Sequence, residues 1–256
     1  MFYISYKVKS TYEKIQLIAF AAGSKQQFTG SGHHQKGDSR KAIHEHPRYR
    51  EVVEVLKSNP AVFHGEYLCY VMQSAEGESV LSVKGYYENG QKVGLWEEYG
   101  SKGHYKNGRK VGEWRYVDAE RRLCQIYDHT KRKFVLKTEQ KQYFYNAKWA
   151  DGSAAESPTF IGGNYYYTST CARYWSFTKE AIDAEVQGAV VARLRLDKEG
   201  KVIGYEIVKT PGYGLENCYK DVFEKVLKTD AYFDSPRMNG KPQACSVEID
   251  LNFYVK

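Results

Sequence analysis

An 18-residue repeat in the middle of the chain constrains the fold more than any other feature of the sequence. One copy reads Gly85-Tyr-Tyr-Glu-Asn-Gly-Gln-Lys-Val-Gly-Leu-Trp-Glu-Glu-Tyr99, and the next reads Gly103-His-Tyr-Lys-Asn-Gly-Arg-Lys-Val-Gly-Glu-Trp-Arg-Tyr116. Asn-Gly dipeptides favour tight turns because both residues tolerate positive φ, and the flanking aromatic residues favour strands. Each copy therefore predicts a β-hairpin, and stacked hairpins must share one apolar layer.

Positions that recur in both copies are expected to be structural rather than ligand-binding. A glycine stands two residues before each tryptophan, and we expect it to leave space for the indole ring against bare backbone. Degenerate half-copies are expected at residues 65–67 and 123–128. The expected structural positions are Gly85, Asn89, Gly90, Gly94, Trp96, Gly103, Asn107, Gly108, Gly112 and Trp114.

The two copies resemble the bacterial form of the MORN repeat, whose signature is Tyr-x-Asn-Gly-x-Lys-x-Gly-x-Trp-x-x-Tyr. The resemblance covers residues 64–128. It implies an elongated antiparallel β-meander that contacts proteins or lipids, and it brings no catalytic residue. The family usually repeats at a slightly longer period, so the connections are expected to be trimmed here.

The residues after 158 predict a second unit with the order β-β-α-β. Apolar residues alternate in residues 188–197 and 201–209, which predicts a hairpin. Apolar residues from Leu215 to Leu227 then follow the helical period, and a short helix is expected earlier, near residues 179–186. From Cys245 onward apolar and polar residues alternate strictly, which predicts a strand with one buried and one solvated face.

This second unit resembles the C-terminal domain of TonB, in the variety common in Bacteroidetes, over residues 158–256. One departure is Tyr174-Trp175, where relatives often have Tyr-Pro. The transducer's membrane helix and proline-rich spacer are also missing, so active energy transduction is not expected. The resemblance rests on Phe160-Ile-Gly-Gly163, Val186-Gln-Gly188, Asp197-Lys-Glu-Gly-Lys-Val202, Asn239-Gly-Lys-Pro242 and Val247-Glu-Ile-Asp-Leu-Asn-Phe253.

The TonB-like resemblance implies that an exposed edge strand accepts an extended peptide from a protein partner such as an outer-membrane transporter. Backbone groups of the edge would supply affinity, and alternate side chains would supply specificity. The last strand is our candidate, and its partner-binding residues are Glu248, Asp250, Asn252 and Tyr254. Two alternatives remain: the edge binds nothing, or residues 2–8 or another subunit cover it. Glycines expected to be structural in this unit are Gly162, Gly163, Gly188 and Gly240.

The fold class is therefore expected to be α+β, a β-meander of hairpins followed by a small β-β-α-β domain. Three parts are expected: residues 1–63 with one helix, residues 64–157 with the repeats and a connector, and residues 158–256. The helix is predicted from Tyr49, Val52, Val53 and Leu56, which lie at i, i+3, i+4 and i+7 between two prolines. Residues 1–22 read either as an atypical export signal or, from the alternation in residues 2–8, as a strand.

Known catalytic signatures are missing from the sequence, so we expect a non-enzymatic protein without a cofactor. Four histidines, at positions 33, 34, 44 and 46, invite a metal site, but acidic or thiol partners at ligand spacing are lacking, and no metal is expected. The five cysteines form no CxxC pair. Cys218 and Cys245 fall on predicted buried faces and are interpreted as core residues. Glu97 and Glu98 are adjacent in a predicted strand, so they should point to opposite faces.

Three functions remain open. The leading one is a periplasmic or cell-envelope module that binds a protein and no nucleic acid. The second is a lipid or anionic-surface binder, because residues 102–148 hold 13 Lys and Arg against 5 Asp and Glu. The third is an antitoxin-like cytoplasmic partner, by association with bacterial MORN-type repeats. Membrane-surface contact and a homodimer also remain open.

Overall fold

The computed structural model describes residues 38–46, 49–72, 79–138, 144–174, 178–228 and 233–254. The described chain divides into two compact units. The meander unit comprises the described residues between 38 and 116, together with 126–136. The C-terminal unit comprises residues 117–125 and the described residues from 137 onward. Antiparallel sheet dominates both units and helices are few, which confirms the α+β class.

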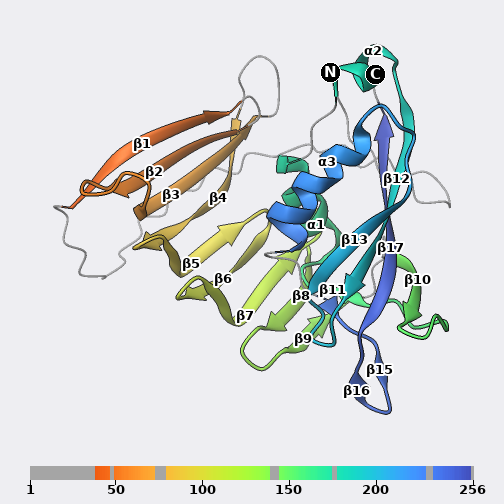
Figure 1. The fold of residues 1–256 in the computed structure, drawn as a ribbon. Helices are drawn as coiled ribbons and strands as arrows, with labels where there is room; N and C mark the ends of the chain where they lie inside the picture. Colours follow the sequence, from red (N-terminus) through yellow and green to blue (C-terminus); the bar gives the residue numbers. More distant parts are fainter. Residues whose placement is uncertain are drawn as a thin grey trace. The chain divides into compact units, whose positions relative to one another are not determined.

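The meander is a nine-stranded sheet in which the strands follow one another in chain order (Figure 1). Consecutive pairs from β1 to β7 are antiparallel. The strands are β1 (Ser39–His46), β2 (Tyr49–Leu56), β3 (Phe63–Met72), β4 (Ser79–Glu88), β5 (Gln91–Glu98), β6 (Ser101–Lys106), β7 (Arg109–Val117), β8 (Leu123–Asp128) and β9 (Lys133–Lys137).

The two predicted hairpins are confirmed. Glu88 pairs with Gln91 across the first turn, and Lys106 pairs with Arg109 across the second. The turn asparagines, Asn89 and Asn107, have φ values of 49° and 50°, and the glycines that follow them are also left-handed. Two consecutive positive φ values match the twist of the strands that they join, which explains the repeated Asn-Gly dipeptide.

The helix predicted between Pro47 and Asn59 is wrong, because Tyr49–Leu56 is strand β2. Val53 and Val55 are each 1% exposed and lie on one face, the period-2 pattern of a strand. The short apolar run fits both periods. Its β-branched valines and the neighbouring strands on both sides favour the sheet.

The C-terminal unit contains a four-stranded antiparallel sheet in the order β10-β17-β12-β13. The predicted hairpin, helix and closing strand are confirmed in their order. The strands of this sheet are β10 (Phe144–Trp149), β12 (Gln187–Leu196), β13 (Val202–Lys209) and β17 (Cys245–Tyr254). Short pairs are β11 (Thr159–Phe160) with β14 (Phe233–Asp234), and β15 (Arg237–Met238) with β16 (Lys241–Pro242).

Three helices accompany this sheet, and the last continues into a π-helical turn. They are α1 (Gly163–Tyr174), α2 (Lys179–Asp183) and α3 (Leu215–Val222), followed by η1 (Phe223–Leu227). The Thr178 side chain caps α2 by accepting a hydrogen bond from Ala181 N, and this helix lies where the sequence predicts it. The α1 helix was not predicted.

The core of the C-terminal unit lies between the sheet and α3 with η1. Leu215, Tyr219 and Val222 are buried on one side of α3, which confirms its predicted apolar face. The ring of Tyr205 on β13 lies 5.2 Å from that of Tyr219 and 4.4 Å from that of Phe223. The helix therefore covers the face of the sheet that the alternation of β17 buries.

Part of the segment expected to be a connector is also built into this unit. Residues 144–149 form β10. In addition, the Gln125 side chain in β8 forms hydrogen bonds to the segment at the start of α1. Its amide nitrogen donates to Phe160 O at 3.2 Å, and its amide oxygen accepts from Gly162 N at 2.7 Å. Local sequence patterns contain no information on such pairings between distant residues.

Candidate functional site

The last strand, β17, is covered by another strand over part of its length, whereas the sequence predicts that it is an open edge. β17 lies between β12 and β10, and β10 pairs with it from Cys245 to Ile249. Glu248 stands within this covered stretch, opposite Tyr145. An extended partner cannot add to β17 at these residues while β10 occupies that side.

Glu248 is instead the centre of a cluster of polar side chains. Arg193 Nη2 donates to Glu248 Oε1 at 2.6 Å, and Asn146 Nδ2 donates to Oε2 at 3.1 Å. Arg193 also forms an ion pair with Glu206 on β13. Burial acts to raise the pKa of Glu248, but the hydrogen bonds from Asn146 and Arg193 hold it below its usual range. These contacts tie β10, β12, β13 and β17 together, which is a structural role.

The other three expected partner-binding residues lie farther along β17, where β12 is the neighbour. Asp250 pairs with Val191, Asn252 with Ala189 and Tyr254 with Gln187. Asp250 is half-buried, and the side chains of Asn252 and Tyr254 lie outside the described part of the chain. β10 therefore pairs with β17 at Glu248, whereas Asp250, Asn252 and Tyr254 lie beyond that stretch.

Strand β13 forms an edge of the four-stranded sheet, and among the described residues it pairs only with β12. Two bulges interrupt that pairing. Val191 faces Lys209 and Ala192 faces Ile207, so Val208 is an extra residue; Arg195 faces Gly204 and Leu196 faces Val202, so Ile203 is another. Ile203 is 59% exposed and Val208 is 44% exposed. Sequence reasoning missed this surface, because alternation reports which face is buried and not where a bulge falls.

The repeat tryptophans, Trp96 and Trp114, lie in the core of the meander, but the glycines have different roles from those expected. A Cβ at Gly85 would lie 2.1 Å from Trp96 Cδ2, and one at Gly103 would lie 2.3 Å from Trp114 Cδ2. Each indole therefore packs on a glycine of the neighbouring strand. The expected positions, Gly94 and Gly112, have no atom near such a Cβ; their φ values of 68° and 61° explain the glycine instead.

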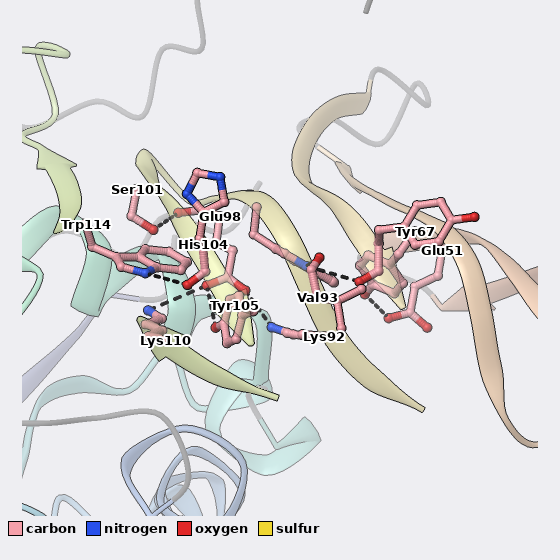
Figure 2. A network of polar contacts seen from close by, with 12 residues as sticks. Glu51, Tyr67, Lys92, Val93, Glu98, Ser101, His104, Tyr105, Lys110 and Trp114 are labelled. Atoms are coloured by element: carbon pink, nitrogen blue, oxygen red, sulfur yellow. Dashed lines mark hydrogen bonds and ion pairs between the residues drawn. The ribbon is translucent and has the colours of Figure 1, made fainter. Parts of the chain in front are cut away.

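Two lysines of the repeat share one buried carboxylate, as Figure 2 shows for Glu98 between Lys92 and Lys110. Lys92 Nζ lies 2.5 Å from Glu98 Oε1, and Lys110 Nζ lies 3.6 Å from Oε2. The Tyr105 hydroxyl donates to the same carboxylate at 3.2 Å. Glu97 points to the opposite, solvated face, where it pairs with two other lysines, so the predicted divergence of the two glutamates is confirmed.

Each of these lysines also lies over the tryptophan of its own repeat. Lys92 Nζ is 4.4 Å from the centre of the Trp96 ring, and Lys110 Nζ is 4.2 Å from that of Trp114. Burial acts to raise the pKa of Glu98, but the two ammonium groups, with the hydrogen bonds from Lys92 and Tyr105, hold it below its usual range. The ionised cluster joins consecutive hairpins and stabilises the meander.

His129 closes the aromatic layer after the second repeat. Its ring nitrogen Nε2 lies 2.9 Å from the Tyr116 hydroxyl, and its ring meets that of Trp114 edge-on at 6.1 Å. Burial, with the nearby charge of Lys110, lowers the pKa of His129 from 6.5 to about 3. His129 is therefore neutral at physiological pH.

The glycines expected to be structural in the C-terminal unit all have positive φ: Gly162 122°, Gly163 71°, Gly188 147° and Gly240 75°. At Gly162 a Cβ would lie 2.5 Å from the Tyr166 ring, so the start of α1 needs this glycine. Gly240 forms the turn between β15 and β16. Their placement supports a structural role.

The cysteine side chains that the structure describes are buried. Cys69, Cys124, Cys171 and Cys245 all lie in the core, and burial raises the pKa of Cys171 to about 12 and that of Cys245 to about 11. Cys245 thus lies in the core as predicted, while the Cys218 side chain lies outside the described part. The described residues contain no group of three metal-ligating side chains, and among them no helix is long and apolar enough to cross a membrane. His33, His34 and residues 1–22 also lie outside that part.

The basic block gathers at two neighbouring turns of the meander. Gly108 N in the β6–β7 turn donates to Lys92 O at 3.0 Å, and His129 N, at the start of the β8–β9 turn, donates to Gly112 O at 2.8 Å. These bonds place both turns along the same rim of the sheet. The exposed cations there, which we name the basic rim, are Lys106, Arg109, Lys131, Arg132 and Lys133.

Comparison of this chain with protein-family models, with curated proteins and with solved structures finds no match.

Proposed function

We propose that the chain is a non-enzymatic protein-binding module of the cell envelope, MORN-like in its meander and TonB-like in its C-terminal unit. An extended segment of a partner protein adds to the sheet of the C-terminal unit as a further strand. The edge that it uses is β13 rather than β17, because β10 covers β17 from Cys245 to Ile249.

The observation that carries this proposal is the identity of the two bulged residues. Proteins commonly place bulges and charged side chains on edge strands to prevent unwanted pairing. Here both bulged residues are aliphatic, and both Ile203 and Val208 are exposed to solvent. Exposing both loses the favourable burial of apolar surface, and a partner that covers them restores it.

The side chains around this edge define the chemistry of the partner. Lys201 and Lys209 are exposed at the two ends of the strand. Glu206, in the middle, is held by Arg193. A matching segment carries acidic residues at its ends, with an aliphatic side chain next to each of them, in an extended conformation that supplies backbone hydrogen bonds.

Selection from a displayed library of random peptides tests the proposal. Selected peptides should be rich in aliphatic residues flanked by acids, and bound peptide should slow amide exchange in β13. Ile203→Lys and Val208→Lys should each abolish binding, whereas Val135→Lys, at a similarly exposed site on β9, should not change it. Protection elsewhere, or equal binding by all variants, would refute the assignment of β13.

The envelope location is tested separately by fractionating cells and sequencing the N-terminus of the recovered protein. Recovery outside the cytoplasm is the expected result. Intact Met1 in the cytosol would contradict the location and favour the antitoxin-like alternative.

The basic rim supports a second candidate function, binding to an anionic lipid surface. Its five cations project from adjacent turns, so they can contact one plane together. Lys131 among them pairs with an acidic neighbour in the same turn, Asp128 at 3.2 Å. Such a surface attracts negative charge over about 10 Å at moderate salt.

Sedimentation with phospholipid vesicles tests this second candidate. The protein should bind vesicles that contain an anionic phospholipid and not neutral ones, and added salt should release it. The variant Arg109→Glu/Arg132→Glu should lose binding. Arg122→Glu is the matched control, because Arg122 already pairs with Asp118 and Glu120. Vesicle binding that does not change with the salt concentration would exclude this function.

A further inference from the structure

Strand β1 is an unusually regular sheet edge. It pairs with β2 without a shift over eight residues, from Ser39 opposite Leu56 to His46 opposite Tyr49. Among the described residues β1 pairs only with β2. A long edge without bulges is a template for another strand, and proteins protect such edges unless they are used.

The outer face of this edge has a pattern of charges that is complementary to itself. Lys41, Ile43 and Glu45 alternate along β1 and share that face, and all three are exposed, Ile43 by 60%. Their partners on β2 are Glu54, Val52 and Arg50, respectively. On this face, each of the three β1 side chains therefore already faces a complementary residue of β2. The two charged pairs flank the apolar pair of Ile43 and Val52.

We propose that β1 pairs antiparallel with β1 of a second copy of this chain, about a twofold axis at Ile43. Lys41 then lies opposite Glu45 of the second copy, Glu45 opposite its Lys41, and Ile43 opposite its Ile43. Across the four strands, Glu54 and Lys41 of one copy are then followed by Glu45 and Arg50 of the second copy. Acidic and basic side chains therefore alternate across the axis. Cross-strand pairs of this kind stabilise antiparallel sheets.

Other registers lose this match. Antiparallel strands related by a twofold axis must bring residues of the same face opposite each other, so the axis can move only by whole residues. With the axis at Ala42, Lys41 faces Ile43; with the axis at His44, Ile43 faces Glu45. On the second face, the axis at Ile43 places Ala42 opposite His44 and Arg40 opposite His46, without opposing two acids or two lysines. Of these three axes, only the one at Ile43 places Lys41 opposite Glu45 and Ile43 opposite Ile43.

The pairing is expected to be reversible. A single pair of eight-residue strands is a smaller interface than the roughly 1,200 Å² at which stable complexes begin. The dimer should therefore dissociate on dilution, and the nine-stranded meander should be continuous between copies only at higher concentration. The proposal is independent of the proposed function, since it concerns the meander and not β13.

Disulfide trapping tests the register directly. Directly opposite residues have Cα atoms about 4.5–5.5 Å apart, within the range of a disulfide. Ile43→Cys should therefore form a covalent dimer under mild oxidation. Lys41→Cys and Glu45→Cys should each remain monomeric alone, because the two copies of either cysteine lie about 14 Å apart. A mixture of these two variants should crosslink, and the unchanged chain is the control for its native cysteines.

A second measurement tests association without added cysteine. The unchanged chain should shift from one to two chains in mass, by light scattering, as its concentration rises toward about 1 mM. Ile43→Lys should stay monomeric with an unchanged circular dichroism spectrum, because Ile43 is exposed and two cations would meet at the axis. A monomer at every concentration, or self-crosslinking of Lys41→Cys as strong as that of Ile43→Cys, would overturn the proposal.

Discussion

The buried carboxylate of Glu98 gives the most direct test of how the meander is held together. Replacing it by glutamine keeps the shape and removes the negative charge. Lys92 and Lys110 then remain beside two tryptophan rings without the Glu98 charge, which in the unchanged protein lies 2.5 Å from Lys92 Nζ. Breaking one side of a buried ion pair typically costs about 3–5 kcal/mol. Because Lys92 keeps part of its contact with solvent, we expect Glu98→Gln to lower the free energy of unfolding by about 3 kcal/mol.

Urea unfolding followed by tryptophan fluorescence is the appropriate assay. Trp96 and Trp114 lie beneath the two lysines and report on this unit directly. Lys110→Met alone should also destabilise, but by less, because its nitrogen is 3.6 Å from the carboxylate and Glu98 keeps Lys92. The double variant should cost less than the sum of the two single variants, since neighbouring charges in one network couple.

Glu97→Gln is the matched control, because Glu97 lies on the solvated face and its pairs with Lys84 and Lys102 are exposed. It should change stability by less than about 1 kcal/mol. A loss for Glu98→Gln no larger than that of the control, or strict additivity with Lys110→Met, would refute the role of the shared carboxylate.

Two further predictions concern the same layer. The pKa of His129 falls from 6.5 to about 3 on folding, so the folded state binds fewer protons and the free energy of unfolding should fall as pH drops through that window. The slope is at most about 1.4 kcal/mol per pH unit, and His129→Phe should flatten it; equal slopes for both proteins between pH 6.5 and 5 would contradict this. Gly103→Ala should cost about 1–3 kcal/mol, because its Cβ would lie 2.3 Å from Trp114 Cδ2. Gly112→Asn should cost much less by the same urea assay, since asparagine tolerates its positive φ and the site is open.

Short-range signals predicted the parts of the fold that they determine. The Asn-Gly turns and the strict alternation after Cys245 identify their hairpins and strand, because turn chemistry and side-chain period act within a few residues. Because such signals act only over a short range, they also wrongly predict a helix for the segment around Val52 and Val53. Over eight residues the two periods overlap, and the neighbouring strands decided between them.

Long-range pairing lay beyond sequence reasoning. Phe144 in β10 pairs with Ile249, and this contact decides that β17 is not an edge there. Local patterns contain no information on which strand lies beside which, so the four expected partner-binding residues were grouped without knowledge of their neighbour. The repeated lysines at 92 and 110 are visible in the signature, but their shared carboxylate depends on the registers of β5 with β6 and of β6 with β7.

The two proposed edges answer one physical problem in different ways. An open edge binds whatever strand it meets unless side chains or bulges discriminate. Regular pairing along β1 allows any strand to approach, so its specificity must come from charge, and Lys41 and Glu45 favour a copy of the same sequence. Irregular pairing along β13 disfavours a flat strand, so its specificity must come from Ile203 and Val208. If these devices are separate, Ile43→Lys should abolish self-association and leave peptide binding unchanged, while Ile203→Lys should do the reverse. If either variant lost both self-association and peptide binding, the assignment of these two activities to separate edges would be refuted.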